Sequence, residues 1–183
     1  MGFLTSTQAK LHDYYLNKEL QNHKATHFSM DLGSAKTVGL LLDATELAGR
    51  EVVLKFSEQL KKQGKEVKLL AFFGGDAKVA NFVFPHFTKK DLDFALRPKT
   101  ADVKKFMDKP FDILINLTPH GSLPLEYIAA FSQAKFRVGP STDKTYCYEL
   151  MIDTAAKKDL QSFIQQVTFF INKMNTTHES STT

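Results

Sequence analysis

Short, continuous apolar runs dominate the middle of the chain, rather than runs that alternate with polar residues. Three of them, at 37–43, 66–73 and 111–117, have the length of a β-strand. Such runs are typical of strands covered on both faces, as in a parallel sheet between two layers of helices. Segments of helical spacing separate them. The pattern therefore predicts strand–helix–strand units with right-handed crossovers.

Helical patterns follow the strands closely. After Asp43 an amphipathic stretch continues until Gly64, which has the usual place of a glycine that ends a helix. Glu46 follows Asp43 at the spacing of a capping box. A shorter helix is expected after Thr100 and another over 123–133. The clearest helix is the last one, where apolar residues recur at three- and four-residue spacing up to Met174.

The rest of the chain is less regular. Segment 82–87 contains Pro85, so we expect an edge strand or a loop below the sheet rather than a central strand. A short strand is expected at 93–96. The first helical segment, 8–23, is interpreted as an arm that packs on the domain or on a partner subunit. The polar, Ser/Thr-rich tail at 175–183 is expected to be disordered.

These elements predict a single three-layer α/β domain over residues 34–174, preceded by a helical arm at 1–33. The expected topology is Rossmann-like, with a mostly parallel central sheet. The last two strands, 135–139 and 146–153, are joined by a loop too short for a crossover helix. We therefore expect an antiparallel pair at one edge. That edge strand or the N-terminal helix could join two copies into a homodimer.

Composition narrows the classes of function. The chain has 24 Lys and Arg against 20 Asp and Glu, and the small excess is scattered, so nucleic acid is not an expected partner. No leader and no run of roughly 20 apolar residues is present, which leaves a cytoplasmic protein as the expectation. The single Cys147 excludes a disulfide framework and is expected to be buried and inert. The six histidines lack the spacing of metal ligands, and we expect neither metal nor cofactor.

The most informative segment is the break after 111–117, where Thr118-Pro-His-Gly-Ser122 leads into a helix. Ligands of doubly wound folds bind at the carboxyl ends of the strands. His120 could act as a general base or bind an anion at the helix N-terminus. Gly121 would allow close backbone approach, and Ser122 could cap the helix or contact a ligand. The alternative is an ordinary turn with an exposed histidine.

Two further turns follow strands at the same expected edge. Asp43 and Thr45 come after the first strand, where a carboxylate could hold a ribose hydroxyl or a metal ion. Helix capping explains the same residues with fewer assumptions. Gly74, Gly75 and Asp76 come after the second strand and could cradle a phosphate. A tight turn is favoured instead, because the dinucleotide-binding and P-loop patterns are absent.

Five segments carry a resemblance to known sequences: 34–43, 111–117, 134–139, 148–153 and the final helix. In this order they resemble a family of short, uncharacterised bacterial α/β proteins, carried as a domain of unknown function. The resemblance covers roughly residues 11–174. It implies an α/β cytoplasmic protein and brings no activity with it.

A more distant likeness rests on 111–117, the helix after it and 132–139. These segments are similar to part of the N-terminal, acceptor-side Rossmann-like half of heptosyltransferase-type glycosyltransferases. In those enzymes a second, C-terminal domain holds most of the nucleotide sugar, and this chain ends before one. It also lacks their Gly-Asp turn, since Leu42 runs directly into Asp43. The likeness therefore implies kinship of fold without shared catalysis.

Two functions remain open from the sequence. The first is a non-enzymatic binding or assembly module on a Rossmann-like scaffold, favoured because no complete catalytic constellation is visible. The second is a small nucleotide- or sugar-phosphate-binding enzyme that takes an anionic small molecule. Its site would comprise Asp43, Gly74, Thr118, His120 and Ser122.

Overall fold

The computed structural model describes residues 2–21, 23, 28–75, 84–154 and 159–174 of the 183-residue chain. Its elements in chain order are α1 (Gly2–Leu20), β1 (Thr37–Asp43), α2 (Leu47–Lys62), β2 (Glu66–Phe73), β3 (His86–Thr88), η2 (Lys89–Asp91), α3 (Ala101–Met107), β4 (Ile113–Asn116), α4 (Leu123–Phe131), β5 (Phe136–Pro140), β6 (Leu150–Ile152) and α5 (Leu160–Lys173). The predicted tail at 175–183 lies outside the described residues.

The strands form one parallel sheet with the order β3-β2-β1-β4-β5-β6. The chain builds outward from β1 to β3 and then returns to the other side of β1 with β4. In the register of this central pair Val38 lies opposite Ile113, and Leu41 lies opposite Asn116. This is the strand order of doubly wound Rossmann-like folds, and the predicted α/β class is confirmed. Its switch point lies between β1 and β4.

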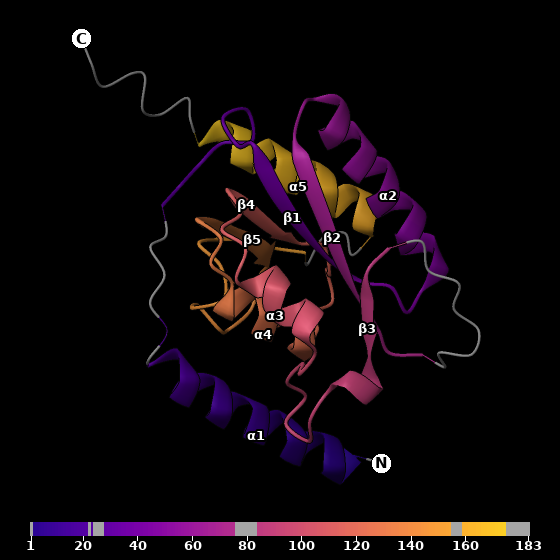
Figure 1. The fold of residues 1–183 in the computed structure, drawn as a ribbon, viewed down its shortest axis with the longest axis vertical. Helices are drawn as coiled ribbons and strands as arrows, with labels where there is room; N and C mark the ends of the chain where they lie inside the picture. The colour runs from indigo at the N-terminus through magenta and orange to yellow at the C-terminus, as the bar shows by residue number, and fades with distance from the viewer. Residues whose placement is uncertain (1, 22, 24–27, 76–83, 155–158, 175–183) are drawn as a thin grey trace.

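Helices cover both faces of the sheet (Figure 1). Helices α2 and α5 pack on one face, and α3 and α4 pack on the other. Neighbouring residues of β1 pack into the cores on opposite faces of the sheet. Leu40 and Leu42 face α2 and α5, while Leu41 faces α3 and α4. Because β1 and β4 are buried on both faces, their sequences read as continuous apolar runs.

Helix α1 packs outside α4 on the same domain, which is one of the two predicted positions for the N-terminal arm. Leu16 is fully buried in the contact. Glu19 accepts a hydrogen bond from the Tyr127 hydroxyl at 2.6 Å and forms an ion pair with Arg97. The helix begins at Gly2 and ends at Leu20, six residues before and three residues short of the predicted limits of 8 and 23.

His12 lies on the buried side of α1. Its Nδ1–H donates to the carbonyl oxygen of Ala95 at 2.8 Å, and its Nε2 has no partner among the described residues. Burial lowers the pKa of His12 from 6.5, and the Lys144 ammonium acts in the same direction. The hydrogen bond to Ala95 and the carboxylates of Asp13 and Glu126 oppose that shift. The imidazole is therefore held neutral beneath the helix.

The predicted antiparallel edge is wrong. Strands β5 and β6 run parallel, with Val138 opposite Leu150 and Pro140 opposite Ile152. The connection 141–149 returns to the start of β6 as an irregular loop without a helix, and Tyr148 of this loop is buried. The predicted strand at 146–153 shrinks to β6 alone because most of it belongs to this loop.

Two other predictions concern the far edge of the sheet. Strand β3 follows Pro85 directly and is the outermost strand, which confirms the edge-strand alternative for the part of 82–87 that is described. The expected strand at 93–96 is wrong. These residues form a turn in which Leu96 has a positive φ of 59°, and Asp93 accepts a hydrogen bond from the Arg97 guanidinium at 2.8 Å.

A largely covered ion pair fastens β5 to α4 and to the loop before β6. The Arg137 side chain is 6% exposed and that of Glu149 is 23% exposed. The guanidinium donates to the Glu149 carboxylate at 2.6 Å. It also donates to the carbonyl oxygens of Ala129 and Ala130, at 3.2 and 2.9 Å, near the end of α4. One side chain thus joins three elements.

The start of β4 is held by Asp112. Its carboxylate accepts hydrogen bonds from Lys135 Nζ at 2.8 Å and from the amides of Lys36 and Thr37, both at 2.9 Å. Partial burial would raise the pKa of Asp112, but these bonds to the ionised form outweigh it and hold the pKa well below 3.8.

Candidate functional site

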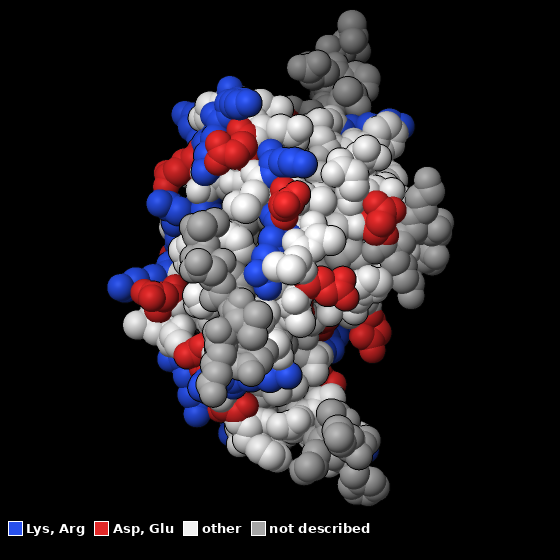
Figure 2. All heavy atoms as spheres, turned by 90° about the vertical axis from the view of Figure 1, so that its right-hand side faces the viewer, with Lys and Arg blue, Asp and Glu red and all other residues white. Residues whose placement is uncertain are grey.

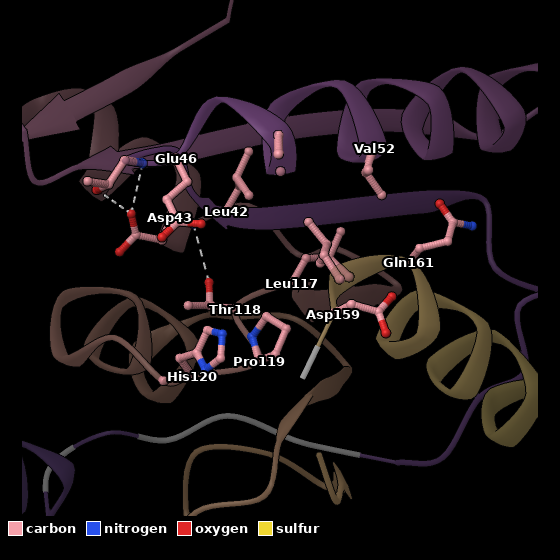
Figure 3. A pocket seen from close by; sticks show the side chains of 15 residues that line it. Leu42, Asp43, Glu46, Val52, Leu117, Thr118, Pro119, His120, Asp159 and Gln161 are labelled. Atoms are coloured by element: carbon pink, nitrogen blue, oxygen red, sulfur yellow. Dashed lines mark hydrogen bonds between the residues drawn. The ribbon is translucent and has the colours of Figure 1, made fainter. Parts of the chain in front are cut away.

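A cavity of about 610 Å³ opens at the switch point of the sheet, within the range of small-molecule sites. Its walls are the carboxyl ends of β1 and β4, the N-terminal turns of α2 and α5 and the loop after β4 (Figure 3). Strand order alone dictates this place, because the chains leaving β1 and β4 turn to opposite faces of the sheet.

The turn after β1 is held by three hydrogen bonds. Asp43 Oδ1 accepts from the backbone N–H and the hydroxyl of Thr45, at 3.0 and 2.5 Å. Thr45 Oγ1 accepts from the Gly74 N–H at 3.0 Å, which ties the exit of β1 to that of β2. Asp43 Oδ2 has no hydrogen-bond partner among the described residues. The turn therefore holds the Asp43 carboxylate in place with one oxygen unused.

The predicted capping box at Asp43 is wrong. The N-cap of α2 is Glu46, three residues further on, and its side chain makes no capping hydrogen bond. The reason is the Asp43–Thr45 turn, which occupies the aspartate and delays the start of the helix to Leu47. Glu46 is left exposed at the edge of the cavity.

Thr118 joins the two central strands at the cavity wall. Its side chain is buried, with the residue 5% exposed, and its hydroxyl oxygen accepts from the Asp43 N–H at 3.3 Å. No described group accepts the hydrogen of this hydroxyl. A buried donor that faces a cavity without an acceptor is available to a ligand.

The loop after β4 is a tight turn. The Gly121 N–H donates to the Thr118 carbonyl oxygen at 3.0 Å, and Gly121 has a positive φ of 73°, which favours glycine there. His120 lies exposed at the tip, lines the cavity and makes no side-chain hydrogen bond to a described residue. Ser122 is the N-cap residue of α4, although its side chain makes no capping hydrogen bond.

Helix α5 closes the third side of the cavity. Its N-cap is Asp159, whose Oδ1 accepts from the Ser162 N–H at 2.8 Å. Leu160 and Gln161 line the cavity from the first turn. The Thr154 hydroxyl, just after β6, donates to the Pro119 carbonyl oxygen at 3.2 Å and so joins this side to the loop after β4.

The cavity brings together most of the residues predicted from the strand ends. Five of them line it: Asp43, Thr45, Thr118, His120 and Gly121. Three lie outside the lining: Gly74, Gly75 and Ser122. Asp76 is not among the described residues. Sequence reasoning assigned no site role to the remaining lining residues, chief among them Glu46, Val52, Asp159 and Gln161.

The lining is acidic and apolar. Among its fifteen described residues three carry carboxylates, namely Asp43, Glu46 and Asp159, and none of the fifteen is a lysine or an arginine. The one imidazole, that of His120, is not hydrogen-bonded to a hydroxyl or thiol nucleophile within the described structure. Among the described residues, no group of three or more His, Cys, Asp or Glu side chains is arranged to hold a metal ion.

The single cysteine takes no part in the site. Cys147 is fully buried in the core beside α4, as predicted. Burial raises the pKa of the Cys147 thiol to about 12, so the thiol stays protonated at neutral pH.

The surface adds two observations. On the face shown in Figure 2 basic and acidic side chains are interspersed, so that face carries no continuous basic surface for nucleic acid. Among the described helices, none combines the length and apolar character needed to cross a lipid bilayer.

Comparison with known proteins places the chain in a family without assigning an activity. Residues 8–174 match a family of unknown function (DUF6913), close to the span of the resemblance seen in the sequence. The search among curated proteins gave no match. Because the match covers most of the chain, the protein belongs to this family of unknown function, DUF6913.

Proposed function

We propose that the protein is a non-enzymatic small-molecule-binding module whose site is the cavity between β1 and β4. The observation that carries the proposal is the coincidence of that cavity with the switch point of the sheet. Fixed polar groups of Asp43 and Thr118 lie there beside apolar surface. This combination is what small-molecule sites have in common.

The alternative is a small nucleotide- or sugar-phosphate-binding enzyme related to the acceptor half of glycosyltransferases. General acid–base catalysis needs a base held within hydrogen-bonding reach of its target. His120 is exposed, and no described side chain orients its ring. This observation favours binding without turnover. A cytoplasmic, bacterial setting and a homodimer through β6 or α1 remain predictions.

Filling the cavity tests the proposed function. Gly49 lines the cavity from α2, and a Cβ at this position would lie 3.4 Å from Leu160 and 3.9 Å from Leu42, which are ordinary contact distances. Gly49→Leu therefore places a side chain in the cavity while the helix can stay in place. Gly49→Ala is the matched control, because it changes the same residue and leaves most of the volume open.

The assay is a thermal-shift screen of the wild type and both variants against nucleosides, nucleotides, sugars, sugar phosphates and amino acids. A ligand at about 100 times its Kd stabilises the native state by about 2.7 kcal/mol. We expect at least one compound to stabilise the wild type and Gly49→Ala but not Gly49→Leu. A wild type that responds to no compound, or equal binding by Gly49→Leu, contradicts the proposal. Conversion of a bound compound to a product supports the enzyme instead.

A further inference from the structure

We propose that the cavity takes an uncharged ligand in which a sugar with adjacent hydroxyl groups is joined to a flat aromatic ring, as in ribonucleosides and aryl glycosides. We further propose that it discriminates against the phosphate esters of such compounds. This inference rests on the proposed binding function and adds the chemical class of the ligand.

Acceptors for hydroxyl groups gather at one end of the cavity. Figure 3 shows Asp43 and Glu46 there, across from Thr118 and His120. Thr45 holds the Asp43 carboxylate through Oδ1. A ligand that binds Oδ2 therefore does not have to immobilise the side chain, which saves the entropy that a mobile carboxylate would lose on binding. Two carboxylates at one end can accept hydrogen bonds from two neighbouring hydroxyl groups of one ligand.

A donor complements these acceptors. The Thr118 hydroxyl is buried and uses its oxygen to accept from the Asp43 N–H, while its hydrogen has no acceptor among the described residues. It can donate to a ring oxygen or to a hydroxyl oxygen. Sugar hydroxyls both donate and accept, and they match this mixed set better than a group that only accepts.

The other end of the cavity combines apolar side chains with the Asp159 carboxylate and the Gln161 amide, which Figure 3 shows on the same side. Leu42 and Leu117 are buried at 2% and 1% exposure, and Val52 and Leu160 extend this surface from the two helices. Figure 3 shows Val52 and Leu117 displaced from the carboxylate end toward Gln161. Burying the face of a flat aromatic ring against such a surface is favourable in free energy, because it removes apolar area from water. The two ends together fit a sugar joined to a base or to an aryl group.

The charge of the lining disfavours a phosphate. The described lining holds three carboxylates and no lysine or arginine that could offset a phosphate dianion. The N-terminal ends of α2 and α5 would attract an anion through their dipoles, but Asp43 and Glu46 already place negative charge at the first and Asp159 at the second. A phosphate would therefore meet like charges in a partly enclosed site.

The test is calorimetric titration of the full chain with matched pairs. The first arm uses four ribonucleosides and their 5′-monophosphates, and the second uses p-nitrophenyl glycosides and their 6-phosphates. We expect a parent compound from one arm to bind with a Kd lower by about tenfold or more than that of its phosphate. The arm that binds distinguishes the two sources. A 2′,3′-dideoxynucleoside or a dideoxyglycoside should lose a similar factor.

Variants identify the groups responsible. Asp43→Asn keeps an oxygen for the Thr45 hydrogen bonds and removes the charge, and we expect it to weaken binding of the parent by about tenfold. Thr118→Val should weaken it as well. Glu58→Gln, which changes an exposed carboxylate of α2 outside the cavity, is the control and should bind like the wild type.

The outcomes separate this inference from the proposed function. Phosphates that bind as tightly as their parents, or a compound of another class that is excluded by Gly49→Leu, overturn the inference and leave the binding function standing. Parent binding that Asp43→Asn leaves unchanged also overturns it. If no compound of the broad screen or of these pairs binds, both proposals fail.

Discussion

Replacement of Arg137 by methionine probes the polar contacts that hold β5 in the sheet. The guanidinium donates to Glu149 and to two carbonyl oxygens of α4, and it is 6% exposed. Methionine fills a similar volume, so Arg137→Met removes the charge and the hydrogen bonds without opening a large cavity. Glu149 then loses its bidentate partner while it stays largely covered.

The expected loss of unfolding free energy depends on how far the Glu149 side chain is buried. Breaking a fully buried ion pair costs about 3–5 kcal/mol. Because the Glu149 side chain keeps 23% of its exposure, water screens part of its charge, and we expect a loss of about 2–3 kcal/mol. With an m-value of about 2 kcal/mol/M, the urea midpoint should fall by about 1–1.5 M.

Urea unfolding followed by circular dichroism measures this loss. Lys104→Met is the matched control, because its ion pair with Asp108 at 2.6 Å is 71% and 58% exposed, and it should cost less than about 1 kcal/mol. Adding Glu149→Gln to Arg137→Met removes the carboxylate charge that no longer faces the guanidinium and should recover part of the loss. A cost below about 1 kcal/mol for Arg137→Met, or no recovery in the double variant, would show that the covered charge of Glu149 does not set the loss.

Three further predictions concern packing and pH. Gly139→Ala places a Cβ 2.4 Å from the buried Tyr148 ring and should cost about 1–3 kcal/mol in the same unfolding assay. Gly64→Ala should cost about 1–2 kcal/mol for a different reason, because its Cβ meets no atom within 4 Å but its φ of 81° is strained for alanine. Because the pKa of Asp112 is lowered on folding, the stability difference between the wild type and Asp112→Asn should be full at neutral pH and should begin to shrink only as the pH falls below about 4, which urea unfolding across pH detects. Because burial lowers the pKa of His12, acidification below about pH 6.5 should destabilise the packing of α1, and the protection factors of the α1 amides, which correct for the pH dependence of intrinsic exchange, should fall in the wild type but not in His12→Gln.

The central fold could be predicted because its signals are local. Strands β1 and β4 and the second half of β2 are buried on both faces, and each carries that burial as an apolar run in its own sequence. The direction of β6 could not be predicted in this way. It depends on how the loop 141–149 packs beneath the sheet, and this is a matter of tertiary contacts such as that of Tyr148 with Asn116.

The site was half predictable for a similar reason. The ends of β1 and β4 follow directly from the strand assignments, which is why Asp43, Thr118 and His120 were found. Asp159 and Gln161 come from the N-cap and the first turn of α5, a helix that follows an edge strand and lies beside α2. No local sequence pattern predicts that α5 lies beside α2. The signal available in the sequence was the N-capping Asp159 before an amphipathic helix. Such a residue indicates that a helix starts there, but it does not indicate where the helix lies in the fold.

The most direct test of the central claim is amide chemical-shift mapping of the isotope-labelled protein with the strongest compound from the screen. If the ligand binds in the cavity, the perturbed amides cluster at 43–49, 117–121 and 160–161, and Gly49→Leu abolishes the changes. Perturbations confined to the groove between α2 and α5, around Phe56, Leu60 and Ile164, would show that the ligand site lies there and not at the switch point of the sheet.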